Sequence, residues 1–236
     1  MIELKNLTVA FGDEIILEDL NLQLPRGELV VIVGKSGSGK SVLMRTILGL
    51  LKPVSGTVLI DGEDIFSLSN HQLNQTRKKI GLLFQGAALL DSLNVFQNVA
   101  LPLVEHQKLA EAELNQRVQA KLEMVGLPEQ GAKYPAELSG GMKKRVGLAR
   151  AIIMQPQYVI YDEPTTGLDP YIADGIIKLI EKMQQKVSSI IVTHDLKCIE
   201  RLASRLVMLD AKKIIFDGTY QDFKKSKNEK IRQFLV

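Results

Sequence analysis

A glycine- and serine-rich stretch, GKSGSGKS at residues 34–41, carries the clearest chemical signal of the sequence. It fits the phosphate-binding pattern G-x-x-x-x-G-K-[ST], with a continuous apolar run before it and a helical stretch after it. Glycines leave successive backbone N–H groups free to turn toward an anion, and a helix N-terminus adds positive potential. The lysine supplies a point charge for the β- and γ-phosphates, and the last serine supplies a hydroxyl ligand for Mg²⁺. The predicted phosphate-binding residues are Gly34, Lys35, Ser36, Gly37, Ser38, Gly39, Lys40 and Ser41.

An acidic pair follows a second apolar run, YVIY at residues 158–161. Such a run predicts a buried strand that delivers Asp162 to the carboxyl edge of a sheet, where ligands bind in open α/β sheets. There Asp162 can hold the water shell of Mg²⁺, and Glu163 can act as a general base on an attacking water. A solvent-exposed acidic pair is the structural alternative, and the phosphate-binding loop on the same chain argues against it.

A second stretch with the shape of an anion site, LSGGMKKR, occupies residues 138–145. Ser139 can cap a helix over residues 140–153, while Gly140 and Gly141 leave the N–H groups of its first turn unshielded. A capped amphipathic helix without any ligand explains the same residues equally well. From these residues alone, both readings stay open.

The elements that must position these residues are predicted to form an α/β protein. The run LVVIV is continuous and β-branched, which is typical of a strand buried on both faces. Strands are predicted at 2–9, 14–24, 29–33, 80–84, 158–163 and 188–195, with a strand and a turn within 56–65 and a hairpin at 206–218. Helices are predicted at 42–51, at 110–127, where Gly126 and Pro128 stop the pattern, and in the tail from Gln221. Because residues 89–150 are mostly of helical period, we predict a helical insertion within an α/β core.

Composition and charge narrow the class of protein. The 236 residues are 45% hydrophobic and 24% charged, which is ordinary for a globular chain. No apolar run reaches eighteen residues and no cleavable signal pattern is present, so we expect neither a membrane span nor a signal peptide. The single cysteine, Cys198, excludes an internal disulfide and fits the cytosol. The net charge is +3, and the basic clusters at 143–145 and 224–227 lack interleaved aromatic residues, so we expect no nucleic-acid partner.

The order of these motifs resembles that of the ATP-binding-cassette (ABC) ATPases over essentially the whole chain. The phosphate-binding loop is followed by Gln85, by LSGGM at 138–142, by YVIYDE at 158–163, by GLD at 167–169 and by His194. The resemblance implies an ATP-hydrolysing subunit that uses Mg²⁺. It also implies that LSGGM binds the ATP held by a partner's phosphate-binding loop, so that two sites form in a head-to-tail homodimer. The two anion-shaped loops of one chain then serve two different nucleotides.

The fold that the resemblance implies is a P-loop, RecA-like α/β core with an N-terminal antiparallel β subdomain and an inserted α-helical subdomain. These parts together form a single domain over residues 1–236. The core and the β subdomain occupy residues 1–87 and 154–236. The helical subdomain occupies residues 88–153 and includes the signature helix, which is the helix that begins in LSGGM, the signature of the family.

Further roles follow from the resemblance, each beside a structural alternative. Phe11 matches the aromatic residue that stacks on adenine, or is a core phenylalanine at a strand end. Gln85 matches the glutamine that touches Mg²⁺ or the water, or is an ordinary surface glutamine. Asp169 matches the aspartate that crosses the dimer interface, or simply caps a helix. His194 matches the histidine that contacts the γ-phosphate, or is a structural histidine with satisfied hydrogen bonds, and its place just beyond a core strand favours the first role. Met142 stands where the family usually has glutamine. The polar contact that this glutamine makes to the sugar of the nucleotide is therefore not implied here, whereas the Ser-Gly-Gly loop is intact. The implied catalytic residues are Lys40, Gln85, Glu163 and His194, and the implied Mg²⁺ residues are Ser41, Gln85 and Asp162.

One branch of the family is favoured by FQGAALLDSLNVFQNVALPLV at residues 84–104, which looks like the ATPase of Mla/Mce-type lipid transporters, as does the methionine of the signature. This implies a peripheral ATPase pair on the cytoplasmic face of the inner (plasma) membrane, docked under a permease near Gln85 to Leu93. An MCE-domain protein and a STAS-domain protein are the further subunits implied, and phospholipid or a related hydrophobic molecule is the cargo. Two other functions stay open, namely a division-type cassette that signals without transport and an importer ATPase for another small solute.

Overall fold

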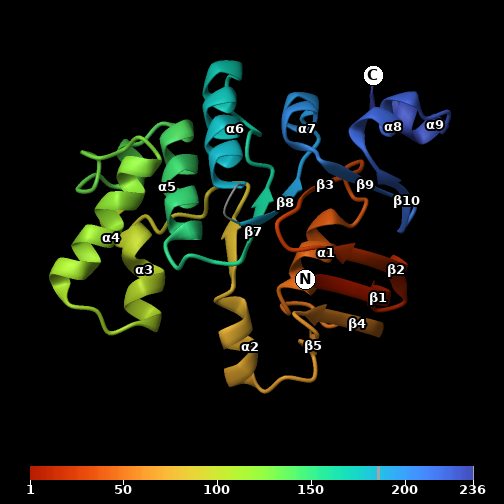
Figure 1. Cartoon of the computed structure of the whole chain (residues 1–236), viewed down its shortest axis with the longest axis horizontal. Helices are drawn as coiled ribbons and strands as arrows, with labels where there is room; N and C mark the ends of the chain where they lie inside the picture. The colour runs from red at the N-terminus through yellow and green to blue at the C-terminus, as the bar shows by residue number, and fades with distance from the viewer. Residues whose placement is uncertain (185–186, 236) are drawn as a thin grey trace.

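The computed structural model of the protein describes residues 1–184 and 187–235. In this part of the chain, two sheets and the surrounding helices form the layers drawn in Figure 1. The strands are β1 (Ile2–Phe11), β2 (Glu14–Leu24), β3 (Leu29–Val33), β4 (Ser55–Ile60), β5 (Glu63–Asp64), β6 (Ile80–Leu83), β7 (Tyr158–Asp162), β8 (Ser188–Val192), β9 (Arg205–Asp210) and β10 (Lys213–Gly218). The helices are α1 (Lys40–Ile47), α2 (Asn70–Arg77), α3 (Val95–His106), α4 (Glu111–Met124), α5 (Gly140–Ile152), α6 (Pro170–Gln184), α7 (Leu196–Leu202), α8 (Tyr220–Lys225) and α9 (Glu229–Phe234), with a short 3₁₀ helix at Pro135–Glu137. Among the helices of the described ranges, none has the length and apolar character needed to cross a membrane.

A six-stranded sheet brings the predicted site loops to one edge. Its order is β10-β9-β3-β8-β7-β6, in which β10 pairs antiparallel with β9 and every other neighbouring pair is parallel. All five residues of β3 are buried, as expected for a continuous apolar run covered on both faces. Because parallel strands end at the same edge, the loops after β3, β6, β7 and β8 lie side by side.

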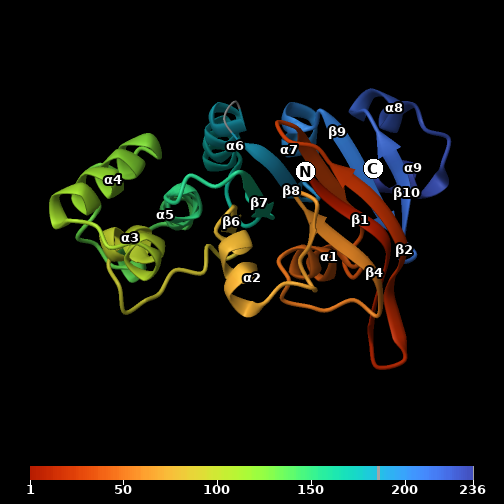
Figure 2. The ribbon, with the colours of Figure 1, turned by 60° about the horizontal axis from the view of Figure 1, so that its bottom comes forward.

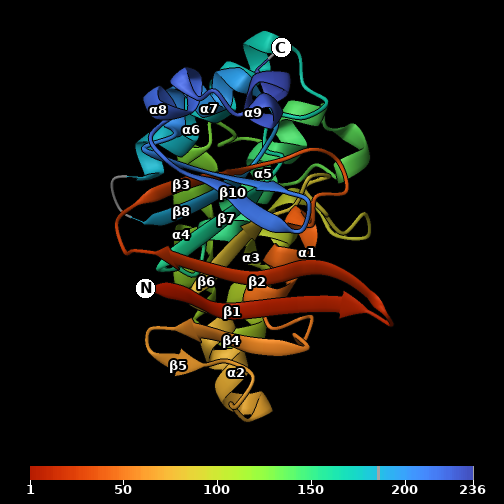
Figure 3. The same cartoon turned by 90° about the vertical axis from the view of Figure 1, so that its right-hand side faces the viewer.

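Each face of this sheet has its own apolar core. Val31 and Val33 belong to the core that the sheet shares with helices α3 to α9. Val30 and Ile32 belong to the core that it shares with α1 and with the four-stranded antiparallel sheet, of order β2-β1-β4-β5. Figure 3 shows β1, β2 and β4 lying below β3, β8 and β10 of the six-stranded sheet. The second core fixes α1, and therefore the position of Lys40 at its first turn.

Helices α3, α4 and α5 form a group at one side of the molecule, away from the four-stranded sheet (Figure 2). Apolar residues of α3 and α4, such as Val99 and Leu122, belong to the same core as α5. The predicted helical character of residues 89–150 is therefore confirmed. Helix α4 ends close to the predicted stop, where Gly126 adopts a left-handed φ of 74°.

The predicted strands and the hairpin are all present, within a few residues of their predicted ends. Two helix predictions differ from the structure. Helix α1 begins at Lys40 and ends at Ile47 rather than at residue 51, because Gly49 takes a left-handed φ of 67°. The tail contains two short helices instead of one, because Ser226 is extended and Asn228 caps a new helix.

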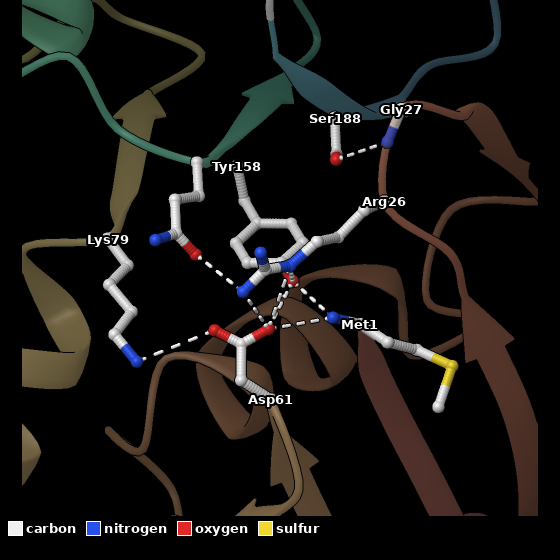
Figure 4. A network of polar contacts seen from close by, with 8 residues as sticks. Met1, Arg26, Gly27, Asp61, Lys79, Tyr158 and Ser188 are labelled. Carbon is white, nitrogen blue, oxygen red and sulfur yellow. Dashed lines mark hydrogen bonds and ion pairs between the residues drawn. The ribbon is translucent and has the colours of Figure 1, made fainter.

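A cluster of polar groups joins the two sheets at the edge opposite the site loops (Figure 4). Asp61, after β4, accepts hydrogen bonds from Tyr158 Oη at 2.8 Å and from the Met1 amine at 2.7 Å. Arg26 Nε donates to it at 3.1 Å, and Lys79 Nζ lies 3.4 Å from its other oxygen. Burial raises the pKa of Asp61, but the hydrogen bonds from the amine, Arg26 and Tyr158 outweigh burial and hold the pKa well below its ordinary value. Asp61 is therefore ionised at neutral pH and ties the strands together.

Candidate functional site

A cleft of about 720 Å³ lies at the carboxyl edge of the six-stranded sheet. It collects loops that are far apart in the sequence, namely those after β3, β6, β7 and β8. The predicted site residues that line it are Gly34, Lys35, Ser36, Gly37, Gly39, Lys40, Ser41, Gln85, Asp162, Glu163 and His194. The structure therefore brings the phosphate-binding loop, the acidic pair, the glutamine and the histidine to one place.

The phosphate-binding loop has the backbone that its glycines permit. Gly37 and Gly39 take left-handed φ values of 79° and 94°, which residues with a Cβ rarely adopt. A Cβ on Gly39 would also lie 2.5 Å from Leu17 Cδ2, so the loop is seated directly on β2. Ser38 Oγ is buried and has no hydrogen-bond partner among the described residues. A buried hydroxyl without a partner is the kind of group that a ligand in the loop can satisfy.

Lys40 extends from the first turn of α1 back across the loop. Its Nζ donates to the carbonyl oxygens of Gly34 at 2.7 Å and Lys35 at 2.9 Å. Burial lowers the pKa of Lys40, while the charges of Glu163 and Asp162 oppose this change. The ammonium group is therefore held inside the loop, beside the backbone N–H groups of the α1 N-terminus.

Glu163 is the most tightly held side chain of the cleft. Its Oε1 lies 2.9 Å from His194 Nδ1, and its Oε2 accepts from Thr166 Oγ1 at 2.9 Å and Thr193 Oγ1 at 3.3 Å. The residue itself has a left-handed φ of 48°, which is strained for any residue with a Cβ. Strain of this kind persists only where the surroundings fix it, so the orientation of this carboxylate is determined by its neighbours.

The second carboxylate, Asp162, has a raised pKa, because it is buried and lies beside the charge of Glu163. Lys144, on α5, is 4% exposed, and its Nζ donates to the backbone oxygen of Glu163 at 2.7 Å. Burial lowers the pKa of Lys144 in turn. Two carboxylates and two lysines thus share one site without a direct carboxylate–ammonium contact among the described residues. Glu163 and Lys144 are buried, whereas Asp162 and Lys40 are half-buried.

Several residues of the site are not predicted by the sequence. Ile16, Val42, Val192 and Phe234 line the cleft, and Lys35 Nζ lies 3.2 Å from Gln233 Oε1 of α9. Lys144, Thr166 and Thr193 hold Glu163. The threonines could have been suspected, because each lies within three residues of a predicted site residue or directly precedes one. Lys144 lies three residues after the predicted Gly141, but nothing in the sequence relates it to Glu163, and Phe234 is far from every predicted site residue. Only the packing of α5 and α9 brings these two residues close to the cleft.

The signature stretch lies outside this cleft. Ser139 Oγ accepts from the N–H of Met142 at 3.3 Å and caps α5, as both interpretations of this stretch predict. A Cβ on Gly141 would lie 2.3 Å from Ile172 Cγ2, and one on Gly140 would lie 3.5 Å from Leu168 Cδ2. Gly141 is therefore required for the close packing of α5 against α6, whether or not it also meets a ligand.

Two further predicted residues are also absent from the described lining of the cleft. Asp169 caps α6, because its Oδ1 accepts from the N–H groups of Tyr171 and Ile172, both at 3.0 Å. Phe11, at the end of β1, is 50% exposed and pairs with Glu14 in the β1–β2 hairpin. A single chain therefore carries one set of predicted residues around the cleft and another set away from it.

This combination of a P-loop after a buried strand, an acidic pair at a neighbouring strand end and a second glycine loop defines a P-loop ATPase of the ATP-binding-cassette class. Residues 17–166 match the family model described as ABC transporter. The chain belongs to this family, and it is an ATP-binding ATPase.

Curated relatives cover the whole chain. It is 42% identical to the intermembrane phospholipid transport system ATP-binding protein MlaF of Haemophilus influenzae, over 100% of this chain and 90% of that protein. It is 41% identical to the probable ribonucleotide transport ATP-binding protein mkl of Mycobacterium leprae, over 99% of this chain and 68% of that protein.

Solved structures share the fold. A dimeric post-hydrolysis state of the ATP-binding cassette MJ0796, bound to ADP and phosphate, matches with a TM-score of 0.85 and 33% identity over 93% of this chain and 98% of that one. The cassette cbiO1 of Clostridium perfringens, part of the transporter complex cbiONQ, matches with a TM-score of 0.86 and 32% identity over 96% and 91% of the two chains. The predicted fold class is thereby confirmed.

Proposed function

We propose that this chain is the ATP-hydrolysing subunit of a membrane transporter that moves phospholipid or a related hydrophobic molecule. The observation that carries the proposal is the division of the predicted residues into two sets, one around the cleft and one outside it. Such a division suits a protein that completes its site with a second copy. The phospholipid assignment is supported by the printed function of the Haemophilus influenzae relative.

The phosphate-binding loop and Lys40 are proposed to bind the phosphates of ATP. The left-handed glycines, the half-buried ammonium group of Lys40 and the unpartnered Ser38 hydroxyl fit an anionic ligand of this size. Ser41, Gln85 and Asp162 line the same cleft and offer hydroxyl, amide and carboxylate oxygens, which are ligands that Mg²⁺ accepts. When bound there, Mg²⁺ neutralises charge on the phosphates during transfer.

Glu163 is the proposed general base toward the attacking water. Its Oε1 and Oε2 are each fixed by hydrogen bonds, so that the carboxylate is oriented before a substrate arrives. His194 reaches the same carboxylate and is more exposed than it, which suits a contact with the terminal phosphate. Lys144 acts on the backbone of Glu163 rather than on substrate.

A second copy of this chain is proposed to supply Ser139, Gly140, Gly141 and Asp169 to the cleft. The dimeric state of the cassette MJ0796 supports this arrangement. Phe11 is proposed to stack on the adenine, because it is an exposed aromatic residue on the β1–β2 hairpin that also carries Ile16 of the cleft. ATP then joins the two copies and favours the closed dimer, and hydrolysis removes that preference.

A permease is proposed to dock in a groove beside the residues that follow Gln85. This groove of about 470 Å³ is lined by Phe84, Ala88, Leu90, Leu101 and Pro102 among others. Phe84 and Leu90 are 44% and 46% exposed, so apolar surface is available to a partner helix. We further propose that residues 88–153 move as a helical subdomain, that an MCE-domain and a STAS-domain protein complete the complex, and that the ATPase lies on the cytoplasmic face of the inner membrane.

The test is purification of the chain with its membrane partners, followed by reconstitution into vesicles. We expect a permease to co-purify with bound phospholipid, and ATP to drive movement of a labelled phospholipid in vesicles carrying the parent complex. Complexes with Glu163→Gln serve as the matched control and should move none. Movement of ribonucleotide instead of lipid, or stable association with a division-type membrane protein without any transport, would overturn the lipid assignment.

A further inference from the structure

Residues 86–93, which follow Gln85 and contribute Ala88 and Leu90 to the proposed permease groove, contain two strained residues in succession. Ala87 and Ala88 have φ values of 60° and 47°, in the left-handed region. For a residue with a Cβ this conformation costs about a tenfold loss of population at each position. Two such residues side by side persist only where the surrounding contacts hold them in this conformation.

Arg150, at the end of the signature helix α5, supplies that group. Its Nη2 donates to the oxygen of Ala87 at 2.6 Å, and its Nη1 donates to the oxygen of Ala88 at 2.8 Å. Burial lowers the pKa of Arg150, and no carboxylate among the described residues lies within ion-pair distance of it. The partly desolvated guanidinium of Arg150 thus donates to the carbonyl oxygens of the two left-handed residues instead of to a carboxylate.

The surface of α5 is also shaped to receive this segment. A Cβ on Gly147 would lie 3.1 Å from Ala87 Cβ and 2.9 Å from Leu83 Cδ1, so Ala87 packs directly on the backbone of the helix. Ala87 is 1% exposed, whereas the side chain of Ala88 is exposed. The conformation of Ala88 therefore depends on its carbonyl bond to Arg150 rather than on packing of its own methyl group.

The other end of the segment is held separately by α3. The buried amide of Asn98 accepts from the N–H of Leu90 at 2.8 Å and donates to the oxygens of Leu90 and Leu93 at 3.0 and 2.8 Å. Arg150, Ala88 and Leu90 all line the docking groove, while Gln85 lines the nucleotide cleft. In Figure 1, α5 stands between α4 and α6.

We propose that Arg150 is a positioning residue for ATP hydrolysis, acting through the backbone of Ala87 and Ala88. Its two hydrogen bonds keep the left-handed pair in place, and the pair in turn keeps Gln85 in the cleft. The same bonds attach the groove to α5, so that a displacement of the signature helix moves the docking surface with it. This second consequence rests on the proposed permease, whereas the first concerns only the ATPase.

The test is a double-variant cycle on the purified ATPase without permease. Arg150→Met removes the donors while keeping an apolar stem, and we expect kcat to fall about tenfold, with the KM for ATP unchanged within twofold. Ala88→Gly makes the left-handed conformation permissible for the exposed position. The double variant Arg150→Met/Ala88→Gly should therefore recover kcat to within about threefold of Ala88→Gly alone.

The control is Ala120→Gly, at an exposed position in α4. Ala120→Gly should lower the thermal midpoint and give no rescue of Arg150→Met, whereas Ala88→Gly should raise the midpoint. If Arg150→Met does not fold, Ala88→Val in the parent tests the same point, because a β-branched residue resists the left-handed region and this side chain has no packing to lose. We expect it to lower kcat about tenfold at unchanged KM.

The proposal is overturned if Arg150→Met, or Ala88→Val in its place, hydrolyses ATP at the parental rate. Equal loss of kcat in the Arg150→Met single and double variants would also overturn it, since a general structural role of Arg150 predicts no rescue by glycine. Because the measurement uses basal hydrolysis, it stands even if the phospholipid assignment is wrong.

Discussion

Acidic groups lie at both ends of strand β7, and the pKa is lowered at one end and raised at the other. At its start, Tyr158 joins Asp61 in a cluster where donors and cations surround one carboxylate and lower its pKa. At its end, Asp162 and Glu163 lie together, and burial and mutual repulsion raise the pKa of Asp162. The first cluster satisfies its own charge and holds two sheets together. The second leaves charge that a bound metal and nucleotide can compensate, which is typical of functional sites.

The lysines near the second cluster sharpen this difference. Lys40 and Lys144 donate to carbonyl oxygens of the backbone, and neither contacts a carboxylate directly among the described residues. Arg26 and Lys79, by contrast, contact Asp61 itself. At the carboxyl edge, Lys40 thus has no carboxylate partner and can bind phosphate, and Lys144 holds the backbone of Glu163, whereas the cations at the other edge are already paired with Asp61.

The largest effect is expected for Glu163→Gln at the functional end. Removing a general base lowers kcat by about 10²–10⁴-fold, while the phosphate-binding loop remains intact. We expect ATP to bind with near-parental affinity and the protein to accumulate as an ATP-stabilised dimer. Steady-state hydrolysis, nucleotide binding and size-exclusion chromatography measure these three outcomes. Glu63→Gln, at an exposed position of β5, is the control, and near-normal hydrolysis by Glu163→Gln would remove it from the role of base.

At the other end of β7, Asp61→Asn should affect stability and leave hydrolysis at 25 °C unchanged. Loss of the charge leaves Arg26 and Lys79 without their partner, and we expect the free energy of unfolding to fall by about 2 kcal/mol at neutral pH. Urea denaturation with the Glu63→Gln control measures this. A variant as stable as its parent would show that the Asp61 cluster contributes nothing to joining the sheets.

The same substitution makes a pH prediction with a defined sign. Because the folded-state pKa of Asp61 is lower than its ordinary value of 3.8, its contribution is fully present above that value and is lost as the pH falls through it toward the folded-state pKa. The difference in stability between the parent and Asp61→Asn should therefore be constant near neutral pH and shrink below about pH 4. A difference that grows on acidification contradicts the assigned cause.

A smaller effect of opposite sign is expected for Asp162→Asn in the absence of nucleotide. Neutralising a carboxylate that is buried beside Glu163 relieves repulsion, and solvent screening limits the gain in unfolding free energy to about 0.5 kcal/mol. Hydrolysis should be lost at the same time. Thermal denaturation and an ATPase assay compare this variant with Asp61→Asn, and a destabilised Asp162→Asn protein would erase the contrast between the two ends.

The local sequence pattern predicts most strands and helices of the fold, and it predicts the phosphate-binding loop and the acidic pair of the candidate site. LVVIV and YVIYDE identify buried strands by their apolar runs, and the glycines of residues 34–41 identify the loop between a strand and a helix. The second helix of the tail and the early end of α1 depend on single residues, Asn228 and Gly49, that a periodic pattern does not detect.

The remaining features depend on tertiary packing. Gly141 was predicted to leave N–H groups open for an anion, and the structure adds a packing requirement against Ile172. Lys144 reaches the backbone of Glu163 only because the fold brings α5 to the loop after β7, and no spacing in the sequence encodes that contact. The Asp61 cluster unites residues from Met1 to Tyr158, so its members are visible only once both sheets are assembled.

The account depends on ATP being held between two copies of the chain. A crystal structure of the Glu163→Gln protein with ATP and Mg²⁺ is the most direct measurement. We predict that Ser139 Oγ and the N–H groups of Gly140 and Gly141 lie within hydrogen-bond distance of the terminal phosphate held by the Lys40 loop of the other copy. An ATP-bound dimer in which Ser139 faces only its own chain or solvent would contradict the account.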